Sequence, residues 1–328
     1  MTDAEWAAVR PLLPVPAWLE GRGGQPEGYC HRVMLDAVRY LLDNGVKWRA
    51  VPADFPAWDR VYAFFRRWRL QGLIAEFHHR LRARVRETEG RRAEPTAAIV
   101  DSQSLRAADT GAAGSRGWDK GKKAGGRKRH LAVDTAGLLL VVHVTPASVQ
   151  DRDAAVPVLN RLRELRRKIT LAWADGGYAG WLVDWARDVL GLALTIVKRS
   201  DDQKGFVVLP RRWVVERTLA WLMHRRRLVR DYERLPATHE AMVMWSMTMV
   251  MGRRLARRPG HPAAAGPRDP AAGVNTPGVS STAHPRATSR LAIDRTHSIF
   301  AGTASRPRAT VRSLARTPSL APTTAMTR

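Results

Sequence analysis

Apolar residues in about the first ninety positions recur at the three- and four-residue spacing of α-helices. One stretch places large apolar residues on a single helical face: Val61, Phe64, Phe65 and Trp68. A second helix is predicted over 73–86, and an earlier one over 28–43, because Asn44 and Gly45 are residues that commonly end helices. We therefore predict an N-terminal helical domain over residues 1–93. It is either a helix-turn-helix-like DNA-binding module or a bundle that packs on the rest of the chain.

From Thr96 onward, the pattern changes to short apolar runs separated by turn-forming residues. The runs lie at 97–100, 130–133, 138–144, 169–173 and 192–197, and helical patterns lie at 152–167 and 181–190. The turn-forming segment 134–137 predicts that the second and third runs form a strand pair. Strands that alternate with helices predict a mixed sheet flanked by helices. We therefore predict an α/β domain over residues 94–257, with the layout of a ribonuclease-H-like core.

Residues 258–328 have a third kind of composition. From 259 onward there are nine arginines, two aspartates, no lysine and one aromatic residue, Phe300, among many Pro, Ala, Thr, Ser and Gly residues. So little apolar surface cannot offset the entropy lost on ordering the chain. We predict a disordered, basic, low-complexity tail. Its composition suggests the hypothesis that it arises from a frameshift or from read-through of a stop codon.

The charge balance predicts a polyanionic partner. The chain carries 55 Lys and Arg against 30 Asp and Glu, a formal net charge of +25, of which residues 259–328 contribute only +7. Double-stranded DNA or RNA is the usual partner of such a surface, because each neutralised phosphate releases counterions. An acidic membrane is the alternative, but we find no lipidation motif, and the longest apolar span, 241–251, is far shorter than the roughly 20 residues that cross a bilayer.

Two further features bear on the compartment. The N-terminus lacks the basic-then-apolar pattern of a signal peptide. The single cysteine, Cys30, excludes intrachain disulfides and cysteine-based zinc clusters. The sequence therefore predicts a cytoplasmic protein with no membrane partner.

Three acidic residues stand where the carboxylates of a two-metal active site are expected. Asp101 and Asp175 each end an apolar, strand-like run, and Glu216 lies on a helix rich in arginine. Two divalent ions about 4 Å apart activate the attacking oxygen and stabilise the leaving oxygen in phosphodiester chemistry. Each acid also has an ordinary explanation, as a turn residue, a helix cap or one half of a surface ion pair. The residues alone leave both explanations open.

Basic residues surround these acids in two groups. The first group is Lys120, Lys122, Lys123, Arg127, Lys128 and Arg129, and the second is Arg211, Arg212, Arg217, Arg225, Arg226 and Arg227. We predict that both groups contact DNA phosphates. The alternative for the first group is a solvated, flexible loop. It is not a nucleotide-binding P-loop, because Gly121 and Lys122 are followed by Lys123 rather than by Ser or Thr.

Six short motifs follow one another along the chain: WDRVY at 58–62, DSQS at 101–104, GGRKRHLAVD at 125–134, ADGGYAG at 174–180, WVVERT at 213–218 and RRLVRDYE at 226–233. In this order they closely resemble bacterial insertion-sequence transposases of the DDE type, and most nearly the group of insertion sequence five. The resemblance runs from about Trp6 to Leu255. It implies a ribonuclease-H-like catalytic domain, Mg²⁺ or Mn²⁺ as cofactor, and terminal inverted repeats as substrate.

By the same resemblance, Asp101, Asp175 and Glu216 are the metal-binding catalytic residues. Two positions depart from the family's pattern: Met223 stands where relatives often carry a basic residue, and His224 where arginine is expected. The leading hypothesis is a transposase that cleaves DNA at the repeats and joins the freed ends to a target, with a homodimer on DNA as a further expectation. The alternatives are a decayed transposase that acts as a DNA-binding protein or repressor, and a nuclease without strand transfer.

Overall fold

The computed structural model describes residues 1–16, 28–197 and 211–257. The predicted tail, 258–328, therefore lies outside the described residues. Within the described ranges, no helix has both the length and the apolar character needed to cross a membrane.

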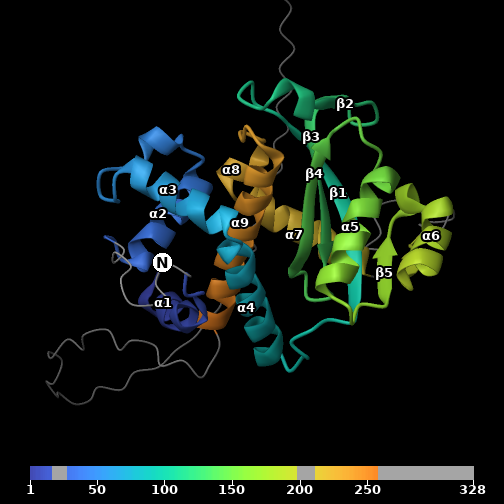
Figure 1. Ribbon diagram of the computed structural model, residues 1–328, viewed down its shortest axis with the longest axis horizontal. Coiled ribbons are helices and arrows are strands. Elements are labelled where there is room, and N and C mark those ends of the chain that lie inside the picture. Colours follow the sequence, from blue (N-terminus) through green and yellow to red (C-terminus); the bar gives the residue numbers. More distant parts are fainter. Residues whose placement is uncertain (17–27, 198–210, 258–328) are drawn as a thin grey trace, which may run out of the picture. The chain divides into compact units, whose positions relative to one another are not determined.

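The N-terminal part is helical, as predicted. Its elements are α1 (Asp3–Val9), η1 (Arg10–Leu12), α2 (His31–Asn44), η3 (Trp48–Ala50), α3 (Trp58–Leu70) and α4 (Leu73–Thr88) (Figure 1). The Thr2 hydroxyl and the Glu5 carboxylate form a capping box at the start of α1. Gly45 ends α2 in a left-handed conformation with φ of 68°, which glycine adopts without steric cost, so the predicted stop is confirmed. All the apolar residues predicted on one face of α3 are buried.

Six strands form one mixed sheet: β1 (Ala97–Arg106), β2 (Gly117–Asp119), β3 (Ala124–Val133), β4 (Leu139–Pro146), β5 (Leu171–Ala174) and β6 (Ala193–Ile196). Its neighbours run in the order β4, β3, β1, β5, β6, and β2 pairs with the first residues of β3. β3 is antiparallel to both β1 and β4, whereas β5 is parallel to both β1 and β6. This is the strand order and direction of a ribonuclease-H-like core, so the predicted fold class is confirmed.

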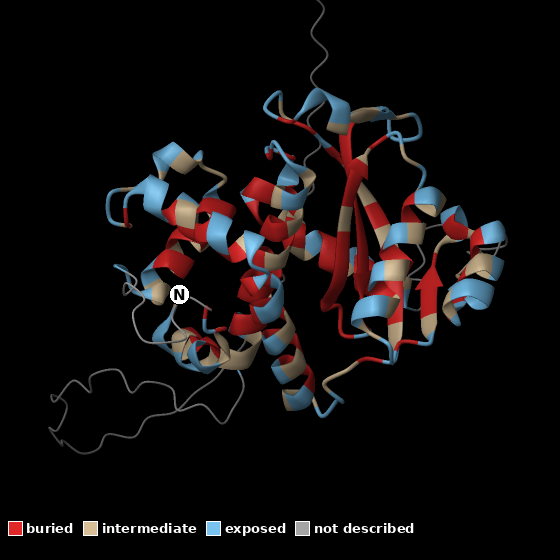
Figure 2. Cartoon of the chain, in the orientation of Figure 1, coloured by how far each residue is buried: buried red, intermediate tan, exposed pale blue. Residues whose placement is uncertain are grey.

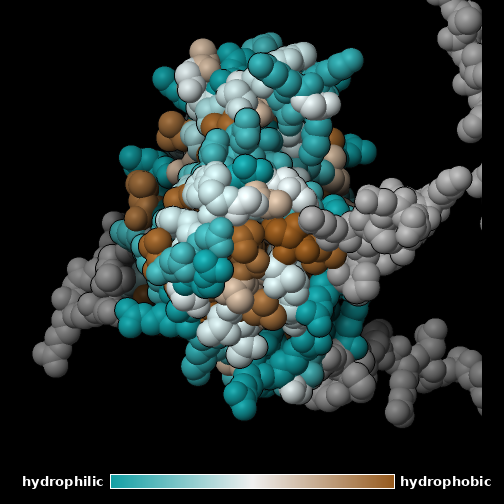
Figure 3. Space-filling model, turned by 90° about the vertical axis from the view of Figure 1, so that its right-hand side faces the viewer, coloured by the Kyte–Doolittle hydropathy of each residue, from teal (hydrophilic) through white to brown (hydrophobic). Residues whose placement is uncertain are grey.

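Helices cover both faces of the sheet (Figure 1). On one side lie α5 (Asp151–Leu165) and α6 (Trp181–Leu190), and on the other lie α7 (Arg212–Met223) and α9 (Pro236–Ala256), with α8 (Arg226–Val229) between those two in the chain. Figure 2 shows that buried residues follow the strands and the inward sides of the helices. On the side where α6 lies, hydrophobic side chains gather in the middle of a hydrophilic surface (Figure 3).

A single apolar cluster joins the N-terminal helices to α9 and to one face of the sheet. At its centre the rings of Trp68 on α3 and Trp245 on α9 stack with centroids 5.7 Å apart. A second cluster joins the other face of the sheet to α5 and α6. The N-terminal helices thus pack on α9 and on the sheet, as the bundle interpretation expects. Whether these helices also bind DNA stays a prediction. The boundary at residue 93 stays a prediction.

The turn at 134–137 joins β3 to β4, as predicted. The buried Asp134 carboxylate accepts hydrogen bonds from the N–H groups of Ala136 and Leu138 at 2.8 and 2.9 Å. It also pairs with the guanidinium of Arg86 on α4 at 2.6 Å. Gly137 completes the turn with φ of 78°. The aspartate therefore closes the turn and ties it to the N-terminal helices.

β3 differs from its prediction at its first half, since it begins at Ala124 rather than at residue 130. Gly126 passes so close to β1 that an added Cβ would lie 1.9 Å from the carbonyl oxygen of Leu105. The residues 127–129 are basic and yet buried. The flexible-loop interpretation is therefore wrong for 124–129, which belong to a strand, whereas the turn at 120–123 is exposed throughout.

Candidate active site

The three predicted acids come from three elements that meet at one place. Asp101 lies on β1, and Asp175 follows the last residue of β5. Because β1 and β5 are parallel, with Ile99 opposite Trp173, the two aspartates lie at neighbouring positions, although β1 continues to Arg106 and does not end at Asp101 as predicted. Glu216 approaches from α7, which packs against β1.

A single arginine links two of these acids. Arg212, one turn before Glu216 on α7, lies 3.3 Å from the Glu216 carboxylate and 3.8 Å from that of Asp175. Asp175 is held in place by a hydrogen bond of 2.9 Å from the N–H group of Gly177. Arg212, predicted to contact DNA, therefore acts here as an internal counterion to the two acids.

The pKa of Asp101 is raised to about 6. Burial is the main cause, and the negative charges of Asp175 and Glu216 add to it, opposed by a hydrogen bond from the Ser102 N–H group and by Arg212. The Ser102 N–H group lies 2.7 Å from the Asp101 carboxylate. The three carboxylates are thus close enough to repel one another.

Carboxylates that repel one another fit a divalent cation, because hard cations prefer oxygen ligands and remove the repulsion. In the described residues, no three His, Cys, Asp or Glu side chains lie close enough together to hold a metal ion as they stand. Arg212 is the cation that partly neutralises Asp175 and Glu216 instead. The three side chains have the oxygen donors that a divalent cation prefers, but a metal ion would require Arg212 to move away and the carboxylates to draw closer together.

A fourth carboxylate, which the sequence patterns did not single out, lies on the other face of β1. Asp151, at the start of α5, accepts a hydrogen bond of 2.7 Å from the Ser102 hydroxyl and pairs with the ammonium of Lys128 at 3.0 Å. Ser102 therefore contacts Asp151 through its side chain and Asp101 through its backbone. The sequence offered one signal, an acidic residue in the first turn of a helix, but such residues usually serve only to balance the helix dipole.

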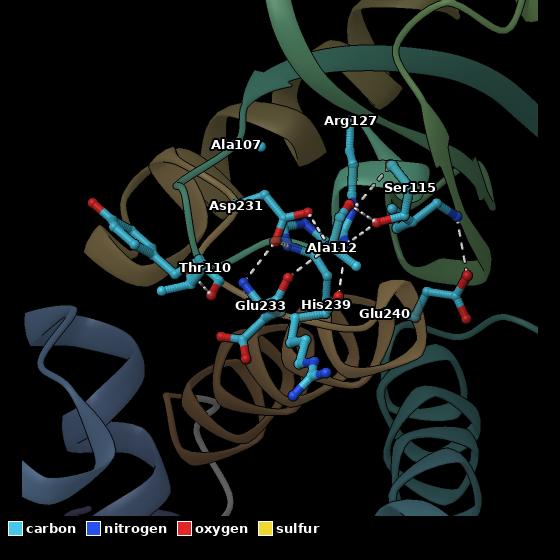
Figure 4. Close-up of polar contacts among 12 residues, drawn as sticks. Ala107, Thr110, Ala112, Ser115, Arg127, Asp231, Glu233, His239 and Glu240 are labelled. Carbon is cyan, nitrogen blue, oxygen red and sulfur yellow. Dashed lines mark hydrogen bonds and ion pairs between the residues drawn. The ribbon is translucent and has the colours of Figure 1, made fainter. Parts of the chain in front are cut away.

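Lys128 is one of the first group of predicted DNA contacts, and the structure buries it together with Arg127 and Arg129. Arg127 pairs with Asp231 at 2.9 Å and donates to the backbone carbonyls of Glu233 and Arg234 (Figure 4). Side chains that are buried and committed to internal acceptors do not face solvent. The structure leaves Lys120, Lys122 and Lys123 of this group exposed in the turn before β3.

The second group of predicted DNA contacts also divides into exposed and internal residues. Arg211 lies over the ring of Trp173 at 4.1 Å, and Arg217 lies between the rings of Trp213 and Trp221 at 4.4 and 4.8 Å. Two arginines are buried and paired with acids, Arg225 with Asp43 and Arg227 with Glu233. Arg226 is exposed.

Sequence comparison identifies the family to which this arrangement belongs. Residues 92–251 match the model "Transposase DDE domain", and residues 1–78 match "Putative transposase of IS4/5 family". The chain belongs to the IS4/IS5-like DDE transposases. The predicted family is thereby confirmed.

Two relatives from Burkholderia cepacia have similar sequences. The chain is 30% identical over 139 residues to "Putative transposase for insertion sequence element IS402", a match that takes in 40% of this chain and 65% of that protein. It is 28% identical over 111 residues to "Insertion element IS402 uncharacterized 16.2 kDa protein", which takes in 33% of this chain and 74% of that protein. The chain therefore spans slightly less than two thirds of the first relative.

Two solved structures show a weak likeness. A piggyBac transposase synaptic complex with hairpin DNA is 11% identical with a TM-score of 0.37, covering 78% of this chain and 72% of that chain. The Mos1 strand transfer complex is 13% identical with a TM-score of 0.22, covering 72% of this chain and 78% of that chain. TM-scores this low do not establish a shared fold. Membership of the transposase family follows from the two sequence models, and the fold class follows from the strand order.

Proposed function

We propose that this chain is a DDE transposase that binds the terminal inverted repeats of an insertion sequence, cleaves DNA there and transfers the freed strand to a target. The observation that carries the proposal is the convergence of Asp101, Asp175 and Glu216 around Arg212, in a chain whose family is defined by this chemistry. Cleavage is the attack of water on a phosphodiester, which releases a 3′-hydroxyl. Transfer is the attack of that hydroxyl on a second phosphodiester, so one site serves both steps.

We propose Mg²⁺ or Mn²⁺ as the cofactor, held by Asp101, Asp175 and Glu216. Such ions activate the attacking oxygen and stabilise the leaving oxygen. The chain's own contribution is placement. The Ser102 N–H group fixes the Asp101 carboxylate, and the Gly177 N–H group fixes that of Asp175. Arg212 has to leave Asp175 and Glu216 before they bind metal, and its guanidinium is then free to pair with a DNA phosphate.

The exposed cations are the proposed DNA contacts. They comprise Lys120, Lys122 and Lys123 in the turn before β3, and Arg211 and Arg226 near α7. We also propose that the helices of residues 1–93 contribute to DNA binding, that the chain acts in the cytoplasm, and that it assembles as a homodimer on two DNA ends.

Metal-dependent nicking of a labelled duplex that carries the flanking terminal repeat tests this proposal. We expect cleavage at the repeat's end with Mg²⁺ or Mn²⁺, and none with chelator or with Glu216→Gln. Glu164→Gln serves as the matched control, because Glu164 is an exposed acid on α5, away from these residues. Binding of the repeat without cleavage by the unaltered chain would instead indicate a decayed transposase that acts as a DNA-binding protein.

A further inference from the structure

Arg129 is a buried cation without an acidic partner among the described residues. Its side chain is fully buried, and its donors reach only neutral acceptors: the Gln103 Oε1 atom at 3.0 Å, the Leu228 carbonyl at 3.1 Å and the Met223 sulfur at 3.4 Å. Burial lowers the pKa of Arg129 to about 9, against a weaker opposing effect from the charge of Asp231. A buried charge is costly unless an opposite charge compensates it. Among the described residues, Arg129 therefore has no negatively charged group in contact with it to compensate its charge.

Gln103 connects this cation to the candidate active site. An arginine only donates hydrogen bonds, so the two donors of Arg129 fix the carbonyl end of the Gln103 amide and turn its Nε2 atom away. The amide atom that faces Arg129 must therefore be the oxygen, because the amide nitrogen could not accept these hydrogen bonds. A donor polarised by a cation behind it is a stronger donor to an anion.

Gln103 also lines a hollow of about 550 Å³ beside the acids. The other lining residues are Glu216, Leu219, Ala220, Met223 and His224. On β1, residues two apart point to the same face, so Gln103 lies on the Asp101 side of the sheet. The hollow thus offers one amide donor, an apolar wall from α7, and the carboxylate of Glu216 at its edge. A nucleotide has the matching parts, namely a phosphate oxygen for the donor and a sugar and base for the wall.

We propose that Gln103 donates its Nε2–H group to a phosphate oxygen of the DNA strand that is cut, and that Arg129 is the positioning residue behind it. The inference rests on the proposed function, because it places DNA in the hollow beside Glu216. It also explains why a cation is buried on β3 without an acid. In this arrangement the negative charge of the phosphate compensates the positive charge of Arg129, with the Gln103 amide hydrogen-bonded between them.

The test combines Gln103→Glu with DNA in which single phosphates next to the cleavage site are replaced, one at a time, by uncharged methylphosphonates. Gln103→Glu keeps an acceptor for Arg129 and removes the donor. For the unaltered chain we expect one methylphosphonate position to weaken DNA binding or slow cleavage by about tenfold, the size expected for a hydrogen bond to a charged group. With Gln103→Glu, natural DNA should lose about the same factor, and the methylphosphonate at that position should cost no more than about twofold further.

Gln150→Glu is the matched control, because Gln150 is an exposed glutamine at the start of α5 that lines no part of the hollow. It should behave as the unaltered chain at every methylphosphonate position. Arg129→Lys keeps the charge but loses the paired donors, and it should weaken the response to the same methylphosphonate. The inference would be overturned if the same methylphosphonate cost about tenfold both in the unaltered chain and in Gln103→Glu. It would also be overturned if Gln103→Glu left the binding and cleavage of natural DNA unchanged.

Binding is measured with Ca²⁺ and cleavage with Mg²⁺, so the two proposals fail separately. If the unaltered chain binds the repeat and does not cut it, the transposase activity is refuted. The affinities across the methylphosphonate series then still decide whether Gln103 contacts a phosphate. If cleavage occurs and the series shows no shared position, the activity stands and the role of Gln103 is refuted.

Discussion

The ion pair between Arg127 and Asp231 predicts a large loss of stability when one partner is removed. Both side chains are 1% exposed, and the Asp231 carboxylate also accepts the N–H group of Glu233 at 2.9 Å and lies 3.3 Å from His239 (Figure 4). Asp231→Asn leaves the Arg127 guanidinium buried without a compensating charge. Loss of one member of a buried pair typically costs about 3–5 kcal/mol of unfolding free energy.

The pKa of Asp231 gives a second measure of the same interactions. Burial alone raises this pKa, but the hydrogen bond and charge of His239, the Glu233 N–H group and Arg127 outweigh it and lower the value from 3.8 to about 2. At about 1.4 kcal/mol per pH unit, this difference corresponds to roughly 2.5 kcal/mol. Because the pKa is lowered in the folded state, this stability is present above about pH 4 and is lost as the pH falls toward 2.

Urea unfolding of the full chain at pH 7, followed by circular dichroism, measures the effect. We expect Asp231→Asn and Arg127→Met each to lose about 3–5 kcal/mol, and the double variant to lose clearly less than their sum, because no uncompensated charge remains. Asp184→Asn is the control, since its partner Arg187 lies on the surface and the two side chains are 65% and 63% exposed. A loss below about 1 kcal/mol for Asp231→Asn, or strict additivity in the double variant, would refute the reasoning.

Three further predictions use the same structure. Asp151→Ala removes the acceptor of the Ser102 hydroxyl beside Asp101 and should slow metal-dependent cleavage by about tenfold, whereas Asp153→Ala, at an exposed acid two residues further along α5, should leave the rate unchanged in the same nicking assay. Replacing the three exposed lysines before β3 by alanine should weaken binding to all DNA sequences and lower the slope of log affinity against log salt by up to about three; an unchanged slope would show that these lysines do not contact phosphates. Burial lowers the pKa of His78 to about 3, so folding stability should fall as the pH drops below about 6.5, and His78→Gln should flatten that part of an acid-unfolding curve.

Elements whose apolar pattern alone determines burial were predictable. One apolar face or a continuous apolar run marks the later strands and the helices at 31–44, 58–70 and 181–190. In these elements, the apolar residues seen in the sequence are the ones that pack against the rest of the fold. The first half of β3 was not predictable in this way. It reads Gly, Arg, Lys and Arg, and it is buried only because residues distant in sequence supply the acceptors: Asp231 for Arg127, Asp151 for Lys128 and Gln103 for Arg129. The local structural preferences of residues 126–129 do not show which distant residues will supply these acceptors.

The same limit applies to the candidate site. The strand ends and the family resemblance place Asp101 and Asp175 near each other, and the parallel pairing of β1 and β5 explains why. Nothing in the local sequence distinguishes Asp151 from an ordinary helix-capping acid, or Arg212 from its neighbour Arg211. One of these arginines lies between two carboxylates and the other lies over a tryptophan ring. Arg211 precedes α7 with a φ of 74°, whereas Arg212 is the first residue of the helix, so the two side chains leave the backbone in different directions.

The formal net charge therefore overstates the number of cationic side chains on this surface that are available to contact DNA. Of the basic residues predicted to contact phosphate, five contribute to internal ion pairs (Arg127, Lys128, Arg212, Arg225 and Arg227), and Arg129 lies beneath Gln103. The surplus of cations still favours a polyanion, because the folded segments carry far fewer acids than bases. The specific contacts that we propose are therefore limited to the predicted cations left exposed and to Arg129 acting through Gln103. The salt dependence of repeat binding should accordingly reflect those few residues, and a slope near the full formal charge would show that the buried cations are displaced when DNA binds.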